Sequence, residues 1–337
     1  MLHRQEKNQN KFSLTCGRLL EGRRNSTNIL MITLSIAVIG LYRSIWASFL
    51  SSSYTPTDRN NAMDESYVTL KNCDESVLDS LDKRFDLQRS ARQKVMNTIS
   101  TADVSFDIYE PEAICFSEER FGSEIRYSAF GDGPKFMCGV DLIARQTANG
   151  GGKKCLIYSV GSNNNIDFEK SVHMHIKGCD VHTFDPTLRN PFIGDKYATF
   201  HPWGLGKDGD EQMAKGKTWI GKSFETIIKE LGHENRTIDV IKIDCEGCEY
   251  ATMPPLFEMI ASGRVKVNQI LIELHLHGSA TRLKDFFLGA DKAKMRVFHK
   301  ERNGWGCEGR KCVEYALVSE RFLREANRDT ICRSSEK

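Results

Sequence analysis

The stretch that decides the fold is "IDVIKIDCEGCEY" (Ile238–Tyr250). Its first half is almost continuously apolar, which is typical of a strand buried on both faces of a parallel sheet. Its second half brings three carboxylates, Asp244, Glu246 and Glu249, directly behind that strand. Open α/β sheets bind their ligands at the carboxyl ends of the strands. The stretch therefore predicts an α/β protein with a polar site where this strand ends.

Strands and helices alternate on both sides of this stretch, which predicts a parallel sheet with helices on both faces. The expected strands before and after it are Cys155–Val160, Cys179–Phe184, Tyr197–Pro202 and Val267–His277. The expected helices are Asp86–Ala102, Ser223–Gly232, capped by its first serine and stopped by its last glycine, and Met253–Ala261. Met295–Glu301 and Cys312–Ser319 flank a Gly-rich loop and predict an antiparallel hairpin at the sheet edge.

Two loops after neighbouring strands carry residues suited to a nucleoside-type ligand. "GSNNN" (Gly161–Asn165) follows the first strand, where Gly161 allows a sharp turn and the next helix offers free N–H groups. "FDPT" (Phe184–Thr187) follows the second strand and places Asp185 where dinucleotide folds have the acid that binds ribose hydroxyls. Asn and Gly are also ordinary turn residues, so a purely structural turn is the alternative.

A set of five motifs resembles a known family. The motifs are "GDGPKFMC" (Gly131–Cys138), "CLIYSVGSNNNIDFE" (Cys155–Glu169), "HTFDPT" (His182–Thr187), the opening stretch and "ILIELH" (Ile270–His275). Together they resemble the class I S-adenosylmethionine-dependent methyltransferases, more narrowly the methyltransferase-like protein 24 group and more distantly the FkbM-type sugar O-methyltransferases. The likeness spans about Phe121–Ser319.

The resemblance implies a Rossmann-like seven-stranded sheet whose last strand is antiparallel, and S-adenosylmethionine as cofactor. The cofactor-binding positions that it implies are Gly161, Ser162, Asn163 and Asn165 under the methionine part, and Asp185 with Pro186 at the ribose. Asp244 would lie beside the methyl group. Two positions depart from the family pattern, since Ser159 stands where many members have an acid and Asn165 where many have glycine. Asparagine tolerates a left-handed backbone, so the turn is expected to form.

The acids after the central strand are the candidate catalytic residues. Methyl transfer to a hydroxyl requires removal of a proton, and Asp244 is placed to act as general base or to orient the acceptor. Lys242 faces the same side of the strand and is a candidate partner for Asp244. Glu246 is expected to bind acceptor hydroxyls or to favour the following helix N-terminus by its charge, and His275 to act as a base or to contact the acceptor. For Glu249 a favourable charge at a helix N-terminus is the preferred interpretation.

The end of the next strand carries side chains of the types that bind metal ions. Glu273, His275 and His277 alternate onto one face, and with Asp244 they have the ligand types of a divalent metal. A polar strand end with one or two solvated histidines is the preferred interpretation. No metal is therefore predicted.

An apolar run near the N-terminus predicts a membrane anchor. "NILMITLSIAVIGLYRSIWASFL" (Asn28–Leu50) contains a single charge, Arg43, and basic residues dominate before it. The prediction is a type II signal anchor with the C-terminal domain in the ER or Golgi lumen or outside the cell; a cleaved signal peptide is the alternative. The expected segments are a cytosolic tail (1–28), the anchor (29–50), a stem (51–84), a cap (85–150), the catalytic domain (151–320) and a C-terminal tail (321–337).

The cysteines agree with an oxidising compartment. Ten of the 11 follow the apolar run and could pair completely. "CEGC" (Cys245–Cys248) has the spacing of redox and zinc motifs, but a structural disulfide, internal or to another cysteine, is preferred. Cys307 and Cys312 are expected to bridge a hairpin loop. "NRT" (Asn235–Thr237) is a glycosylation acceptor pattern.

The function that these patterns favour is methylation of a hydroxylated small molecule or glycan by a membrane-anchored enzyme. The net charge of +2 gives no support to nucleic-acid binding. A luminal glycosyltransferase is one alternative, with "DGD" (Asp208–Asp210) as its metal and nucleotide-sugar motif. A scaffold that keeps the fold without catalysis is another, supported by Ser159 and Asn165.

Overall fold

The computed structural model describes residues 75–99, 105–122, 134–148, 154–188, 190–275, 280–303, 307 and 311–334. All of them belong to one compact unit, Leu70–Lys337. Within these residues, no helix has both the length and the apolar character needed to cross a bilayer. The predicted cytosolic tail and anchor, and the predicted stem as far as residue 74, lie outside the described residues.

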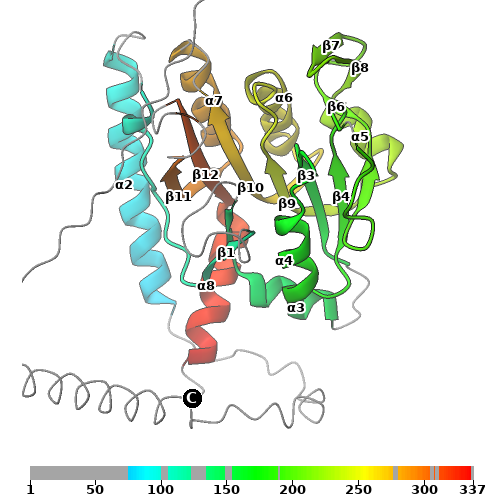
Figure 1. Cartoon of the computed structure of the whole chain (residues 1–337). Helices are drawn as coiled ribbons and strands as arrows, with labels where there is room; N and C mark the ends of the chain where they lie inside the picture. The colour runs from blue at the N-terminus through cyan, green and yellow to red at the C-terminus, as the bar shows by residue number, and fades with distance from the viewer. Residues whose placement is uncertain are drawn as a thin grey trace, which may run out of the picture. The chain divides into compact units, whose positions relative to one another are not determined.

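A seven-stranded sheet forms the centre of the molecule (Figure 1). Its strands, in spatial order, are β11 (Met295–Arg302), β12 (Cys312–Ser319), β10 (Lys266–His275), β9 (Thr237–Ile243), β3 (Leu156–Val160), β4 (Asp180–Phe184) and β5 (Thr199–His201). β12 runs antiparallel to both of its neighbours, and the other pairs are parallel. The predicted sheet with an antiparallel last strand is confirmed. The predicted hairpin also forms, but β12 lies inside the sheet and β11 takes the edge.

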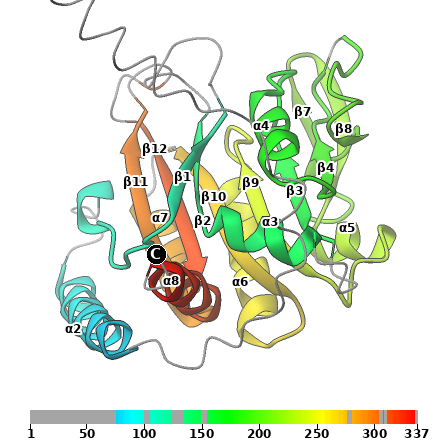
Figure 2. The same cartoon turned by 90° about the horizontal axis from the view of Figure 1, so that it is seen from below.

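Helices cover both faces of this sheet, as predicted (Figures 1 and 2). They are α2 (Ser76–Thr98), α3 (Val140–Ala148), α4 (Asp167–His175), α5 (Phe224–Glu230), α6 (Glu249–Ala261), α7 (Ala280–Lys292) and α8 (Glu320–Ser334), with a short 3₁₀ helix η2 (Phe106–Ile108) after α2. One hydrophobic cluster packs α5, α6 and α7 against the sheet, and a second packs α3, α4 and α8. Successive residues of β3, such as Ile157 and Tyr158, belong to the two different clusters. The continuous apolar runs of the strands follow from burial on both faces.

A small hairpin crosses the second face of the sheet. It consists of β1 (Glu118–Phe121) and β2 (Lys135–Cys138), which pair antiparallel. Cys138 is bonded to Cys115 in a disulfide, and its backbone exchanges two hydrogen bonds with the Gln269 side chain on β10, at 2.7 and 2.9 Å. These contacts hold β2 in one position against β10.

The helix predicted over Asp86–Ala102 begins earlier, at Ser76, within the segment predicted as stem. Several of its charged residues form ion pairs with the folded unit. Arg92 forms ion pairs with Glu112 at 2.7 Å and with Asp291 at 2.6 Å. The charged composition therefore indicated a stem where the structure has a helix that packs through ion pairs.

The segment predicted as a C-terminal tail, 321–337, is mostly the helix α8. Phe322 and Ala326 are buried, one helical turn apart, and a Cβ on Gly139 would touch both. The charged residues around them concealed this apolar stripe in the sequence. The C-terminal segment thus forms part of the core.

A small three-stranded sheet is inserted between β5 and α5. Its strands are β6 (Gly204–Leu205), β7 (Glu211–Ala214) and β8 (Lys217–Lys222). The Asp208 carboxylate accepts hydrogen bonds from the Ser223 backbone N–H (2.7 Å) and hydroxyl (2.8 Å). Ser223 caps α5 and Gly232 takes a positive φ at its end, as predicted. The DGD triplet therefore has a structural role at a helix start.

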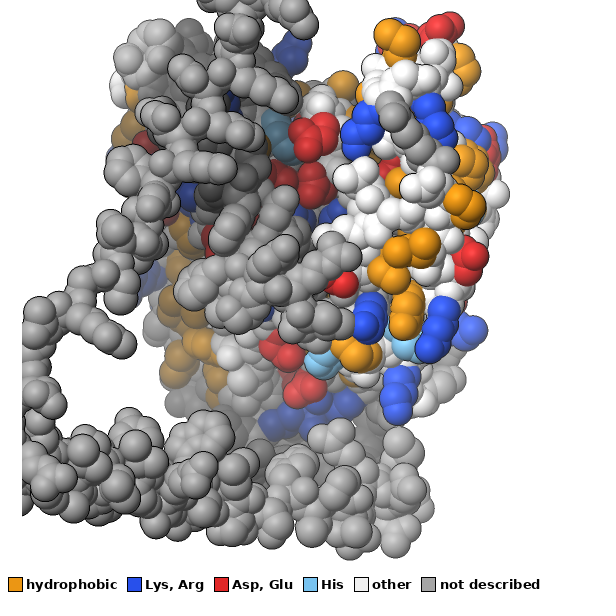
Figure 3. All heavy atoms as spheres, in the orientation of Figure 1, with side chains coloured by type: hydrophobic (Ala, Val, Ile, Leu, Met, Phe, Trp, Pro, Cys, Tyr) orange, Lys and Arg blue, Asp and Glu red, His pale blue; other side chains and the backbone are white. Residues whose placement is uncertain are grey.

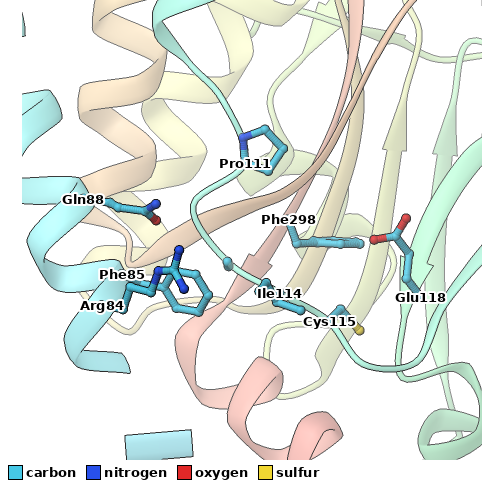
Figure 4. A pocket seen from close by; sticks show the side chains of 9 residues that line it. Arg84, Phe85, Gln88, Pro111, Ile114, Cys115, Glu118 and Phe298 are labelled. Atoms are coloured by element: carbon cyan, nitrogen blue, oxygen red, sulfur yellow. The ribbon is translucent and has the colours of Figure 1, made fainter. Parts of the chain in front are cut away.

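A pocket lies between α2, the segment after η2 and the edge strand β11 (Figure 4). Arg84, Phe85 and Gln88 of α2 line one side, and Pro111 and Ile114 line another. None of the candidate site residues lines it. We therefore place the functional site elsewhere, at the strand ends.

Candidate active site

The sheet has its switch point between β3 and β9. The chain runs outward from β3 through β4 to β5, and then resumes at β9 on the other side of β3. The Asp244 N–H donates to the Val160 carbonyl at 3.0 Å, directly before Gly161. Gly161 has a φ of +74°, and a Cβ there would lie 1.7 Å from the Asp244 carbonyl oxygen. The glycine turn at Gly161 and the acid Asp244 at the end of β9 therefore meet at the edge where open α/β sheets bind ligands.

The loop after Gly161 is a tight turn made by three asparagines. Asn163 and Asn164 have φ values of +45° and +61°, the left-handed region that asparagine tolerates. Asn165, which we expected to replace a left-handed glycine, is not among the positive-φ residues. Its side-chain oxygen instead accepts a hydrogen bond from the Asp167 N–H (3.2 Å) at the start of α4. The turn survives as predicted, but its left-handed residues are the two before Asn165.

Asp185 ties this loop to the loop after β4. Its side chain is buried and accepts hydrogen bonds from the Asn163 N–H (2.7 Å), the Thr187 N–H (2.8 Å) and the Thr187 hydroxyl (2.7 Å). Pro186 lies between Asp185 and Thr187 in the same turn. Ser162 is also buried, and its hydroxyl accepts from the Asn164 N–H at 3.3 Å. A carboxylate has about four acceptor positions, so Asp185 retains room for one further donor such as a ribose hydroxyl.

Asp244 has an ion-pair partner that the sequence analysis did not single out. The Lys135 ammonium, from β2, lies 3.8 Å from Asp244 Oδ2 and 2.5 Å from Glu314 Oε1 on β12. Burial by itself would raise the pKa of Asp244, but the charges of Lys135 and Lys242 outweigh it and hold that pKa below its usual range. Lys242, the expected partner, donates to the Gly161 carbonyl at 2.6 Å. Asp244 is therefore ionised at neutral pH.

Glu273 behaves in the opposite way. It lies opposite Glu314 in the strand register and accepts a hydrogen bond from the Asn303 side chain at 2.8 Å. Burial, and then the negative charges of Glu314 and Asp244, raise the pKa of Glu273 to about 8. At neutral pH Glu273 therefore keeps its proton and donates a hydrogen bond to the ionised Asp244.

His275 is held between two acids. Its Nδ1 lies 2.8 Å from Glu249 Oε1, and its Nε2 lies 3.4 Å from Glu246 Oε2. Burial would lower the pKa of His275, but the hydrogen bond to Glu249 and its charge raise that pKa to about 9. The ring is therefore a cation at neutral pH, suited to donate hydrogen bonds and unsuited to act as a general base. Glu249 begins α6 as expected, yet it is fully buried and positions His275, which corrects its interpretation as a simple helix-end charge.

The disulfides expected from the sequence are present at the site. Cys245 is bonded to Cys248, and Cys307 is bonded to Cys312. The first bridge closes a four-residue loop in which Glu246 and Gly247 have φ values of +57° and +125°. Glu246 is largely exposed, so its carboxylate is accessible from solvent. The bridge therefore presents Glu246 at the mouth of the site.

The residues of the metal hypothesis only partly come together. Ligand atoms of Asp244, Glu246 and His275 lie within 4.8 Å of one another, whereas His277 lies outside the described residues. Glu273 and His275 also lie near Cys307 and Cys312, whose sulfurs are in a disulfide and are not free to ligate. Lys135 and the cationic His275 already neutralise these carboxylates. We therefore assign no metal to them.

These side chains form an acidic surface where the parallel strands end. Figure 3 shows acidic side chains gathered near the upper edge of this face, next to a histidine and facing a wall that carries lysine or arginine side chains. Sequence reasoning found Asp244, Glu246 and His275 but missed Lys135 and Glu314. The available signal was a charged residue inside an apolar strand, as in "CVEYALV" (Cys312–Val318). Such a charge must be paired when buried.

The comparisons with known proteins agree with this geometry. A family model described as a methyltransferase domain matches residues 61–319. "Probable methyltransferase-like protein 24" of Homo sapiens is 26% identical over 207 residues, which cover 60% of this chain and 48% of that protein. The protein of the same name from Rattus norvegicus is 29% identical over 164 residues, which cover 44% of this chain and 43% of that protein. The chain thus spans less than half the length of these curated relatives.

Solved structures of methyltransferases are also similar to the chain. One is the O-methyltransferase from Bacillus cereus in complex with SAH, with 13% identity and a TM-score of 0.33, covering 54% of this chain and 80% of that chain. Another is 1,6-didemethyltoxoflavin-N1-methyltransferase from Burkholderia thailandensis, with 10% identity and a TM-score of 0.30, covering 54% of this chain and 78% of that chain.

The family model, which matches most of the chain, defines the class: the chain belongs to the methyltransferase-domain family. Within that class its curated relatives are the methyltransferase-like protein 24 group. The residues present fit the cofactor. Gly161 lets the loop after β3 turn directly against the Asp244 backbone, and Asp185 keeps one acceptor position for a ribose hydroxyl.

Proposed function

We propose that the chain transfers a methyl group from S-adenosylmethionine to a hydroxyl group of a glycan or another small hydroxylated acceptor. The observation that carries the proposal is the ionised carboxylate of Asp244 at the switch point, against the glycine turn of the cofactor loop. Carboxylates accept hydrogen bonds from hydroxyl groups, and Glu246 adds a second, exposed carboxylate at the same place. The choice of a hydroxylated acceptor rests on this chemistry.

The side chains suggest how the proton is handled. The bound cofactor supplies an electrophilic methyl group on a cationic sulfur. Asp244 would accept a hydrogen bond from the acceptor O–H and would take its proton as the oxygen displaces sulfur from the methyl carbon, so that one C–O bond forms while the C–S and O–H bonds break. Because the pKa of Asp244 is low, it is a weak base, and proton transfer is expected late, when the oxygen has become acidic. His275 and Glu246 hold other hydroxyl groups of the acceptor.

Binding of the methyl donor tests the proposal. We expect the full-length chain, solubilised in detergent, to bind S-adenosylmethionine in a calorimetric titration. Asp185→Ala should weaken binding by about 100-fold, because it removes a carboxylate that organises both cofactor loops. Asp180→Ala is the matched control, since Asp180 begins the same strand at its opposite end and pairs with Arg236. It should bind the donor as the wild type does.

If well-folded wild-type protein did not bind the donor, the proposal of methyl transfer would be wrong, and a non-catalytic scaffold would be favoured. Binding of a UDP-sugar with manganese in its place would favour a glycosyltransferase. Asp208 is engaged by Ser223 at the start of α5, which supports neither of these alternatives.

We further propose that residues 29–50 anchor the chain in the membrane, with the described unit in the secretory lumen or outside the cell. Four disulfides between cysteines of the described segments, and the exposed Asn235 in the glycosylation pattern before β9, support this location. Asn235 should carry a glycan in secretory cells. The expected result is a glycosidase-sensitive mobility on gels that is absent in Asn235→Gln and retained in a control variant, Asn190→Gln. A wild-type chain whose mobility does not respond to glycosidase would contradict it.

A further inference from the structure

Lys135 is the buried cation of the site, and it comes from outside the parallel sheet. Its side chain is 1% exposed. β2 carries it across the face of the sheet, and the Cys115–Cys138 disulfide and the Gln269 hydrogen bonds fix β2 there. A lysine that loses its hydration so completely must be compensated by nearby negative charge. That charge is supplied by Glu314 at 2.5 Å and by Asp244 at 3.8 Å.

The charges around Asp244 show what Lys135 contributes. The ionisable groups that face it are Lys135 on β2, Lys242 on β9, Glu246 in the disulfide loop, Glu273 and His275 on β10, and Glu314 on β12. The Lys242 ammonium is engaged with the Gly161 carbonyl at 2.6 Å, and His275 is engaged with Glu249 and Glu246. Lys135 is therefore the cation that lies between Asp244 and the acids of β10 and β12.

We propose that Lys135 is a positioning residue that holds the negative charge of Asp244 at the cofactor site, so that the enzyme favours the cationic methyl donor over its neutral product. This inference rests on the proposed function, because it uses Asp244 beside the transferred methyl group. S-adenosylmethionine carries a positive sulfonium, whereas the product S-adenosylhomocysteine is an uncharged thioether. An ionised carboxylate attracts the first and not the second. Without Lys135, Asp244 shares its charge and proton with Glu273 and Glu314, and the discrimination is lost at a higher pH.

The test compares affinities for donor and product, and needs no acceptor. The dissociation constants of S-adenosylmethionine and S-adenosylhomocysteine are measured calorimetrically from pH 3 to pH 8 on the full-length chain. In Lys135→Met the preference for the donor should fall by up to about tenfold as the pH drops below the pKa of Asp244 in the variant, corresponding to a rise of about one unit in that pKa, and should stay as in the wild type at neutral pH, where Asp244 is ionised in both. The product should bind as it does to the wild type. Because an ionised Asp244 is present only above its pKa, the donor preference should disappear at a higher pH in this variant than in the wild type.

Three variants separate this role from a merely structural one. Lys135→Arg should restore the wild-type preference. Glu314→Gln should move the loss of preference to lower pH, because Lys135 then compensates Asp244 alone. Asp244→Asn should show no dependence on pH in this range.

A Lys135→Met chain that folds and keeps the wild-type preference throughout this range would overturn the inference. If that variant does not fold, an unchanged pH dependence in Glu314→Gln would overturn it instead. Wild-type protein that binds neither ligand would refute the proposed function itself.

Discussion

Replacing Gly161 with alanine is expected to lower the free energy of unfolding by about 3 kcal/mol or more and to abolish binding of S-adenosylmethionine. The added Cβ would lie 1.7 Å from the backbone oxygen of Asp244, a contact that no side-chain rotation can relieve. Relief requires β3 and β9 to separate at Val160 and Ile243, where they pair, and this breaks the switch point. Urea unfolding measures the first effect and calorimetric titration with the donor the second.

Gly232→Ala is the matched control for this experiment. Gly232 has nearly the same backbone conformation, with a φ of +68°, but a Cβ there meets nothing within 4 Å. It should lose only the cost of the left-handed conformation, about 1–2 kcal/mol, and should bind the donor normally. Equal losses of stability in the two variants would show that the approach of Asp244 to Gly161 is not the reason for the glycine.

Asp244→Asn is expected to reduce methyl transfer by about 100-fold to 10,000-fold, because an amide neither carries the negative charge nor accepts the proton of the acceptor. The substitution preserves the size of the side chain, and Lys135 keeps its ion pair with Glu314. Binding of S-adenosylhomocysteine, which has no sulfonium charge, should therefore stay within about threefold of the wild type. The measurement is transfer of a labelled methyl group to a hydroxylated acceptor that the wild type methylates.

Asp195→Asn, at an exposed position before β5, controls for removal of an acid in general and should leave transfer unchanged. If Asp244→Asn retained transfer within tenfold of the wild type while Asp195→Asn behaved as expected, Asp244 would not be the proton acceptor. The base would then have to be sought among the other groups of the acidic surface.

Much of this fold could be predicted because short stretches of the sequence determine its strands. The parallel strands are apolar throughout and are bounded by turn residues, so β3, β4, β9 and β10 were expected to within one or two residues. The helices α2 and α8 were not delimited in the same way. Their apolar stripes are narrow and their other faces are charged, and only packing shows that these charges meet partners such as Glu112 and Asp291.

The same division applies to the candidate site. The sequence by itself placed Gly161, Asp185 and Asp244 at strand ends, because the parallel arrangement brings those ends to one edge of the sheet. It also predicted the Cys307–Cys312 bridge, and a structural disulfide at Cys245 and Cys248 whose partners only the structure settled.

Only the tertiary structure decided which charges are active and which are neutralised. The partner of Asp244 is Lys135, more than one hundred positions earlier in the chain, and not its neighbour Lys242. The protonation of Glu273 and His275 depends on burial and on acids from other strands. Charge interactions act through space and change with local burial, so the spacing of residues along a strand does not reveal them.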